Sequence, residues 1–293
     1  MKVKVECAPC LVHRGYMEIM EATSNSSLQF EAMSALTRLL HREFKPNAVP
    51  ALLGTERDRL VKKVTGNSDP YREKKRLSNE KALEILPEAK RLIENESSQR
   101  KRFRKACLSS IVGNVIEFDI LNYAFNFENI KMLIQRAEQE LAIDEVKKFF
   151  DLAKKSREIL YLADNAGEIA LDTLLVHELK KLGAEVKVAV KGKPIVNDAT
   201  MDDAKTVGMH KVADKVVSTG TDTVGLILEE CSKRFLTFYE SADFVVSKGM
   251  GHAETLTELN LKTPHVLLLR TKCNPVANFF GALKERNIAK VMP

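Results

Sequence analysis

The sequence of 293 residues lacks the long apolar runs of membrane proteins. No uninterrupted apolar segment approaches the roughly 20 residues that a membrane helix needs. Charged residues interrupt the N-terminus, MKVKVECAPC, from its second position onward, whereas a signal peptide requires a continuous apolar stretch. We therefore expect a cytoplasmic protein without a membrane span. Cysteine is also scarce, and the odd number of five argues against a secreted disulfide framework.

A large excess of one charge is absent as well. The formal net charge is +6, which suits nucleic acid and small anionic substrates equally. The basic runs at 71–76 and 100–105 could form a nucleic-acid patch, but solvated helix faces often carry such runs and Glu94 and Glu96 lie close by in the sequence. We therefore favour a small anionic ligand over nucleic acid as the partner. The oligomeric state is left open.

The hydrophobic pattern changes near residue 156. Between about residues 11 and 155, apolar residues recur every three or four positions, as at Leu36, Leu39 and Leu40, which is helical spacing. After that point, short β-branched runs at 158–162, 185–190, 215–218, 244–247 and 265–269 alternate with helical stretches. This order predicts a parallel sheet flanked by helices. We predict a helical subdomain at 1–155 and an α/β domain at 156–293.

Polar residues follow the predicted strands, at the edge where parallel sheets bind their ligands. Asp164, Asn165 and Glu168 follow the first strand, and Asp198 follows the second. Helix capping is the competing explanation for each aspartate. Acids and amides at two adjacent strand ends are, however, the oxygen ligands that a hard divalent cation prefers. The sequence therefore predicts a metal site formed by Asp164, Asn165 and Asp198, with positions open to water and a substrate oxygen.

Glycines and lysines follow the later strands. Lys248, Gly249 and Gly251 come after the fourth, with Glu254 beyond them, and Lys272 comes after the fifth. Glycine allows close approach of the backbone and lysine supplies positive charge, which together suit a phosphate, although either lysine could be an ordinary surface residue. A metal site facing these lysines predicts metal-assisted attack of water on a phosphoryl group.

Four motifs follow one another along the second half of the chain. They are DNAGE at 164–168, KGxPxxNDxT at 191–200, SKGxG at 247–251 and KCxPVA at 272–277. In this order they resemble the metal-dependent damage-control phosphatase family, formerly a domain of unknown function. The N-terminal Cys-x-x-Cys resembles its stand-alone prokaryotic and archaeal branch. The resemblance spans roughly residues 110 to 280.

The resemblance implies a helical N-terminal subdomain packed on a Rossmann-like, three-layer α/β/α domain. It also implies a phosphatase active with manganese, cobalt, nickel or magnesium on sugar phosphates or damaged phosphometabolites. Metal ligation carries over to Asp164, Asn165 and Asp198, and we assign catalytic roles to Asp164, Asp198 and Glu168. Substrate contacts are assigned to Gly113, Asn114, Lys248, Gly249, Glu254 and Lys272. The family pattern has an amide where this chain has His252.

Other functions receive less support from the motifs. A thioredoxin-like use of Cys7 and Cys10 needs a βαβ context, and only an apparent strand at 3–5 precedes them. A zinc site needs four ligands, of which only these cysteines and His13 are local, so Cys7 and Cys10 are assigned a possible structural role. The Gly-x-Gly-x-x-Gly of dinucleotide-binding oxidoreductases and the Asp-x-Asp-x-Thr of haloacid-dehalogenase phosphatases are absent. A non-catalytic sensor of metals or metabolites is the alternative function, because a sequence shows ligands but no turnover.

Overall fold

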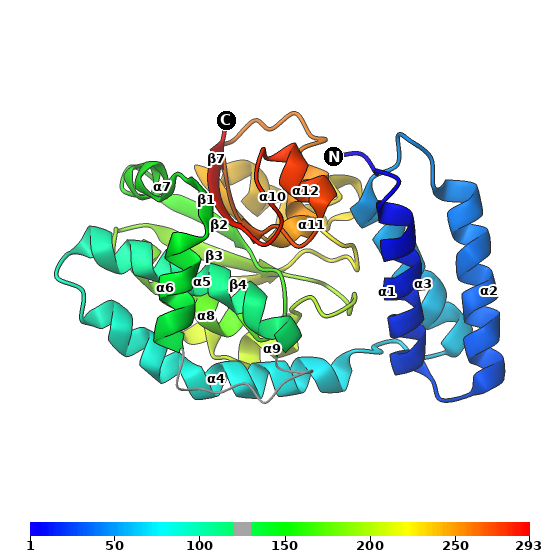
Figure 1. Cartoon of the computed structure of the whole chain (residues 1–293). Helices are drawn as coiled ribbons and strands as arrows, with labels where there is room; N and C mark the ends of the chain where they lie inside the picture. Colours follow the sequence, from blue (N-terminus) through cyan, green and yellow to red (C-terminus); the bar gives the residue numbers. More distant parts are fainter. Residues whose placement is uncertain (120–129) are drawn as a thin grey trace.

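Three helices at the N-terminus form a unit with its own core. The computed structural model describes residues 1–119 and 130–293, and the side chains of all of these except 114–119. Helices α1 (Cys7–Ala22), α2 (Ser26–Glu43) and α3 (Pro50–Thr65) lie to one side of the molecule (Figure 1). Buried Ile19, Leu36 and Val61 join them through one apolar cluster. We refer to α1, α2 and α3 as the three-helix unit.

The next helices belong to the body of the protein. Helices α4 (Arg72–Glu94), α5 (Gln99–Asp119), α6 (Ile130–Gln139) and α7 (Val146–Ala153) precede most of the sheet. Phe103 of α5 and Phe149 of α7 pack edge to face at 4.8 Å between ring centroids, and both share a buried cluster with Tyr161 and Val246 of the sheet. The region 1–155 therefore contains helices of two kinds, one group packing on itself and the other on the sheet.

The described residues form one seven-stranded sheet with the order β1-β7-β6-β5-β2-β3-β4. Its strands are β1 (Leu141–Asp144), β2 (Glu158–Leu162), β3 (Glu185–Val190), β4 (Lys215–Ser218), β5 (Phe244–Lys248), β6 (His265–Arg270) and β7 (Asn287–Met292). Strands β6, β5, β2, β3 and β4 pair in parallel, whereas β7 is antiparallel to β6 and parallel to β1.

Helices cover both faces of the sheet. The core shared with α4 to α7 also takes in α8 (Glu168–Lys180) and α9 (Met201–Thr206). The core on the other face takes in α10 (Lys233–Ser241), α11 (Gly249–Leu256) and α12 (Asn274–Phe279). Alternate residues of β2 divide between the two, since Ile159 and Tyr161 point to the first core and Leu160 and Leu162 to the second. The predicted three-layer α/β/α fold is confirmed.

The structure departs from the predicted secondary structure in three places. Residues 3–5 do not form a strand; they precede α1, and the backbone N–H of Val3 donates to the carbonyl of Ala48 at 2.9 Å. The region predicted to be helical throughout contains β1, and β7 adds an antiparallel strand that the sequence pattern did not indicate. The five predicted strands are confirmed to within a residue. The division into 1–155 and 156–293 stays a prediction.

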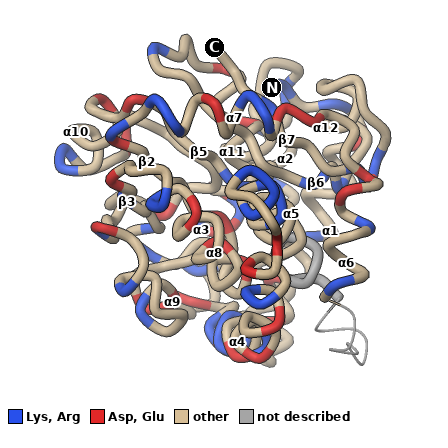
Figure 2. The backbone as a smooth tube through the Cα atoms, turned by 90° about the vertical axis from the view of Figure 1, so that its left-hand side faces the viewer, with Lys and Arg blue, Asp and Glu red and all other residues tan. Residues whose placement is uncertain are grey.

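The basic runs of the sequence form ion pairs on the surface. Arg104 lies 2.8 Å from both Glu138 and Asp144, and Arg76 pairs with Glu73 at 2.5 Å. Figure 2 shows Lys and Arg interleaved with Asp and Glu along the chain, for example around α4. Acidic neighbours therefore offset the positive charge of these helices. Among the described residues, no helix combines the length and the apolar character needed to cross a membrane.

Candidate active site

A cavity of about 350 Å³ lies between the three-helix unit and the carboxyl edge of the sheet. Asp164 and Asn165, which follow β2, and Asp198, which follows β3, contribute to its wall. Because β2 and β3 are neighbours in the sheet, the three predicted metal ligands lie on one side. The cavity wall also includes Cys7, Cys10, Arg14, Arg57, Glu254 and Lys272.

Backbone hydrogen bonds join the two loops that carry these ligands. Asn165 and Asp198 form an isolated antiparallel bridge. The N–H of Ala166 donates to the carbonyl of Asn197 at 2.9 Å, and the N–H of Ala199 donates to the carbonyl of Asp164 at 2.8 Å. The relative position of the ligands is therefore fixed by the main chain as well as by the strands.

Neither aspartate of the site caps a helix. Helix α8 begins after Gly167, which makes no side-chain cap. Helix α9 begins after Thr200, whose N–H and hydroxyl both donate to the carboxylate of Asp203, at 2.8 and 2.7 Å. The capping explanation for Asp164 and Asp198 is therefore wrong, and both residues contribute to the wall of the cavity.

The amide of Asn165 has a defined orientation. Its Nδ2 donates to Oδ2 of Asp164 at 2.8 Å and to Oε2 of Glu168 at 2.9 Å. Because both acceptors are carboxylates, the amide nitrogen must face them. The oxygen of Asn165 is therefore the atom that can serve as a ligand, as the predicted metal site requires.

Asp198 is a buried carboxylate next to a buried cation. Burial raises the pKa of Asp198 to about 6, although Lys191, with its Nζ 3.4 Å from Oδ2, acts in the opposite direction. Lys191 also donates to the carbonyl of Gly225 at 2.6 Å. A desolvated carboxylate of this kind favours further positive charge nearby, so the donor set fits a divalent cation.

Gly249 lies against the carboxylate of Asp164. It has a φ of +79°, in the left-handed region, and a Cβ there would lie 1.9 Å from Oδ2 of Asp164. Both the backbone conformation and the available space therefore require glycine at this position. The close backbone approach that the sequence predicted at Gly249 is therefore made to the carboxylate of Asp164.

Comparisons with known proteins identify the family. Residues 3–288 match the family described as Damage-control phosphatase ARMT1-like domain. A damage-control phosphatase of Archaeoglobus fulgidus is 33% identical over 293 residues and covers 100% of both chains. The chain belongs to this family. The predicted resemblance is confirmed, and the protein is a phosphatase.

Further relatives have the same length and fold. An uncharacterized protein of Methanocaldococcus jannaschii is 40% identical over 285 residues, which are 96% of this chain and 92% of that protein. The crystal structure of a DUF89 family protein from Pyrococcus horikoshii has a TM-score of 0.88 at 33% identity, and the match covers 99% of this chain and 98% of that one. The damage-control phosphatase fold therefore extends over nearly the whole chain, including the three-helix unit.

Two predicted site residues of this phosphatase lie behind the cavity wall. Lys248 is fully buried, and its Nζ donates to the carbonyl of Ser110 and to Asp172, both at 2.9 Å, and to Glu168. Burial lowers the pKa of Lys248, but the two carboxylates outweigh this and raise it. Its three donors are thus used internally. Lys248 and Glu168 do not line the cavity, which differs from the substrate and catalytic contacts expected for them.

The other residues considered for substrate contact differ in their position relative to the cavity. Lys272 and Glu254 line the cavity, and burial raises the pKa of Glu254 to about 7. The side chain of Asn114 lies outside the described residues. His252 is buried off the cavity wall, with Nδ1 2.7 Å from the carbonyl of Lys248, and burial lowers its pKa to about 3. His252 is therefore a neutral, internally bonded side chain.

The N-terminal cysteines of this phosphatase are free thiols on the cavity wall. Cys7 is buried and Cys10 exposed, and burial raises the pKa of Cys7. Within 1–113 and 130–293, no three or more His, Cys, Asp or Glu side chains gather in a group able to hold a metal ion. The predicted metal site differs from such a group because it combines the amide of Asn165 with two carboxylates. A structural role for Cys7 and Cys10 stays a prediction.

Sequence reasoning missed three basic residues at the site. Lys191 directly follows β3, so the rule that located Asp198 could have found it. Arg14 of α1 and Arg57 of α3 line the cavity from the three-helix unit. No local pattern distinguishes these two arginines from others on the same helices, because only the packing of that unit on the sheet brings them to the cavity.

Proposed function

We propose that this phosphatase is a metal-dependent phosphomonoesterase acting on small phosphorylated metabolites, such as sugar phosphates or damaged phosphate esters. The observation that carries the proposal is the joint presence of Asp164, Asn165, Asp198 and Lys272 on the wall of one cavity. The volume of about 350 Å³ is near the lower end of small-molecule pockets, which begin at roughly 300 Å³.

Asp164, Asn165 and Asp198 would hold the cation through oxygen atoms, a donor set that suits Mn²⁺, Co²⁺, Ni²⁺ or Mg²⁺. When bound, such an ion polarises the phosphoryl group and makes a water molecule more acidic. Glu168 fixes the amide of Asn165 by accepting from Nδ2 at 2.9 Å, and Lys248 holds Glu168. We therefore propose Glu168 and Lys248 as positioning residues.

The other charged groups of the cavity would act on the substrate. Lys272 and Arg14 bring positive charge toward the phosphoryl oxygens, which stabilises the charge that develops during transfer. Glu254, whose pKa burial raises to about 7, can exchange a proton with a substrate group near neutral pH. The cavity thus combines an anion-binding side with oxygen ligands for a cation.

The proposal is tested with metal-stripped protein, assayed on p-nitrophenyl phosphate and a panel of sugar phosphates after return of each divalent metal. We expect activity only with metal, its loss in Asp164→Ala, and a large fall in kcat/KM without loss of stability in Lys272→Ala. Asp202→Ala is the control, because Asp202 is an exposed carboxylate four residues beyond Asp198. Turnover that survives both metal removal and Asp164→Ala would refute metal dependence. Metal binding without turnover would instead favour a sensor.

A further inference from the structure

The turn that carries Asp198 has an unfavourable backbone conformation. The N–H of Asp198 donates to the carbonyl of Ile195 at 3.0 Å, which closes a tight turn. Within it, Val196 has a φ of +44°. This left-handed conformation is disfavoured for a β-branched residue and persists only where the surroundings impose it. Val196 and Asn197 both line the cavity, so relaxation of the turn would move the cavity wall.

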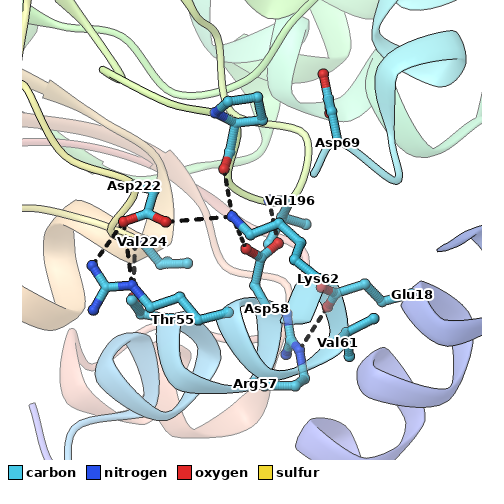
Figure 3. A network of polar contacts seen from close by, with 12 residues as sticks. Glu18, Thr55, Arg57, Asp58, Val61, Lys62, Asp69, Val196, Asp222 and Val224 are labelled. Atoms are coloured by element: carbon cyan, nitrogen blue, oxygen red, sulfur yellow. Dashed lines mark hydrogen bonds and ion pairs between the residues drawn. The ribbon is translucent and has the colours of Figure 1, made fainter. Parts of the chain in front are cut away.

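Helix α3 supplies the contact that holds this turn. Asp58 is fully buried, and its Oδ1 accepts from the backbone N–H of Val196 at 2.9 Å (Figure 3). The other oxygen, Oδ2, lies 2.6 Å from Nζ of Lys62. The same Nζ donates to the carbonyl of Pro194 at 2.7 Å. Two side chains of α3 therefore hold the turn. Asp58 bonds the N–H of Val196 within it, and Lys62 bonds the carbonyl of Pro194 just before it.

Helix α3 is itself anchored on both sides. Toward the sheet, the hydroxyl of Thr55 accepts from the N–H of Val224 at 2.9 Å, in the loop that follows β4. Toward α1, Nε of Arg57 lies 3.0 Å from the buried carboxylate of Glu18. Asp58 thus projects from a fixed support (Figure 3). A hydrogen-bond acceptor on such a fixed helix can keep Val196 in a conformation that it would otherwise leave.

We propose that Asp58 is a positioning residue that sets the affinity of the metal site by holding the Ile195–Asp198 turn. This inference rests on the proposed function, because that proposal is what assigns Asp198 as a metal ligand. Loss of the acceptor removes the partner of the Val196 N–H, so Val196 leaves the left-handed region and the carboxylate two residues later is displaced. Outer-shell partners that orient metal ligands commonly change metal affinity by about 10- to 100-fold.

The test measures Mn²⁺ affinity by calorimetry on folded, metal-stripped protein. We expect Asp58→Ala to bind Mn²⁺ about 10- to 100-fold more weakly, and Asp58→Asn, which keeps an oxygen acceptor, to retain most of the affinity. Asp58→Leu fills the same volume without an acceptor and replaces the alanine variant if that does not fold. Adding Val196→Gly to Asp58→Ala is expected to restore part of the affinity, because glycine adopts the turn without strain.

Arg59→Ala is the matched control. Arg59 lies on the same helix and pairs with Asp222 at 2.8 Å and Glu230 at 2.5 Å, across the same interface. Its link to the turn is indirect, through Asp222, which lies 3.4 Å from Nζ of Lys62. This variant is expected to lower the melting temperature and keep the Mn²⁺ affinity. Asp58→Ala or Asp58→Leu protein with wild-type affinity would overturn the proposal. Failure of the proposed function itself is distinct, because the wild-type protein would then bind Mn²⁺ no better than Asp198→Ala.

Discussion

The proposed oxygen ligands of the metal site are held in place by neighbouring residues. The carboxylate of Asp164 accepts from Nδ2 of Asn165 at 2.8 Å, while Gly249, directly after the neighbouring parallel strand β5, leaves room for it. This position requires glycine for two independent reasons, its positive φ and the lack of space for a Cβ. Mutation can test the two reasons separately.

Gly249→Ala is expected to abolish most of the activity. Its Cβ would lie 1.9 Å from Oδ2 of Asp164, so the carboxylate must move, and a displacement of about 1 Å at a reacting centre can cost roughly 100-fold in rate. The measurement is kcat/KM on p-nitrophenyl phosphate, with thermal unfolding in parallel. Gly208→Ala is the control, because Gly208 has a φ of +74° but its nearest neighbour atom would lie 3.9 Å from the Cβ. Equal losses of activity in both variants would show that backbone strain, and not the clash with Asp164, causes the loss.

Residue types and strand ends predicted the cavity-facing carboxylates, but they could not separate the two lysines. Lys248 is the last residue of β5 and Lys272 follows β6, and both precede helices. Only burial distinguishes them, since Lys248 turns inward to Asp172 while Lys272 lines the cavity. Asp172 lies one helical turn beyond Glu168, and an internal ion pair of this kind has no signature in a single sequence.

At the scale of elements, the parallel core of the sheet was predictable and its far edge was not. Strands β2, β3 and β5 are buried nearly throughout, on both faces, and most of their residues are therefore apolar. By contrast, β1 has only four residues with an alternating burial pattern, and its sequence continues the helical spacing of α6. The contact of α3 with the turn before Asp198 was also beyond prediction, because its partners are more than a hundred residues apart.

The contact between Glu18 of α1 and Arg57 of α3 predicts how stability varies with pH. Burial raises the pKa of Glu18 to about 8 from 4.5, against the effect of Arg57 and with that of Asp58. Between pH 4.5 and about 8, Glu18 is therefore protonated in the folded state and deprotonated in the unfolded state. In this range the contribution of Glu18 to stability is expected to fall as pH rises, by up to about 1.4 kcal/mol per pH unit.

Glu18→Gln is expected to reduce this pH dependence. The measurement is urea unfolding of the metal-stripped protein between pH 5 and 8. Glu21→Gln is the control, because Glu21 is on the same helix and forms a half-exposed ion pair with Lys74 at 2.6 Å. Asp198 and Glu254 also have raised pKa values and contribute a slope of the same sign to every variant. Parallel curves for wild type and Glu18→Gln would contradict the assignment.

At the scale of the whole molecule, the cavity exists only when two separately packed regions meet. Its wall combines residues from α1 and α3 with the loops after β2, β3 and β6. The proposed ligands Asn165 and Asp198 are 33 positions apart in sequence but form a backbone bridge in the fold. An unfolded chain does not bring these oxygens together, so a divalent ion should bind the folded state selectively.

Metal binding is therefore expected to stabilise the whole fold. A ligand that binds only the folded state adds about 2.7 kcal/mol at 100 times its Kd, which for a chain of this size raises Tm by on the order of 5 °C. The measurement is calorimetric unfolding of metal-stripped protein with and without Mn²⁺. Asp202→Ala is expected to show the same rise and Asp198→Ala none, because only Asp198 lies on the cavity wall. An equal rise in Asp198→Ala would place the bound ion elsewhere on the protein.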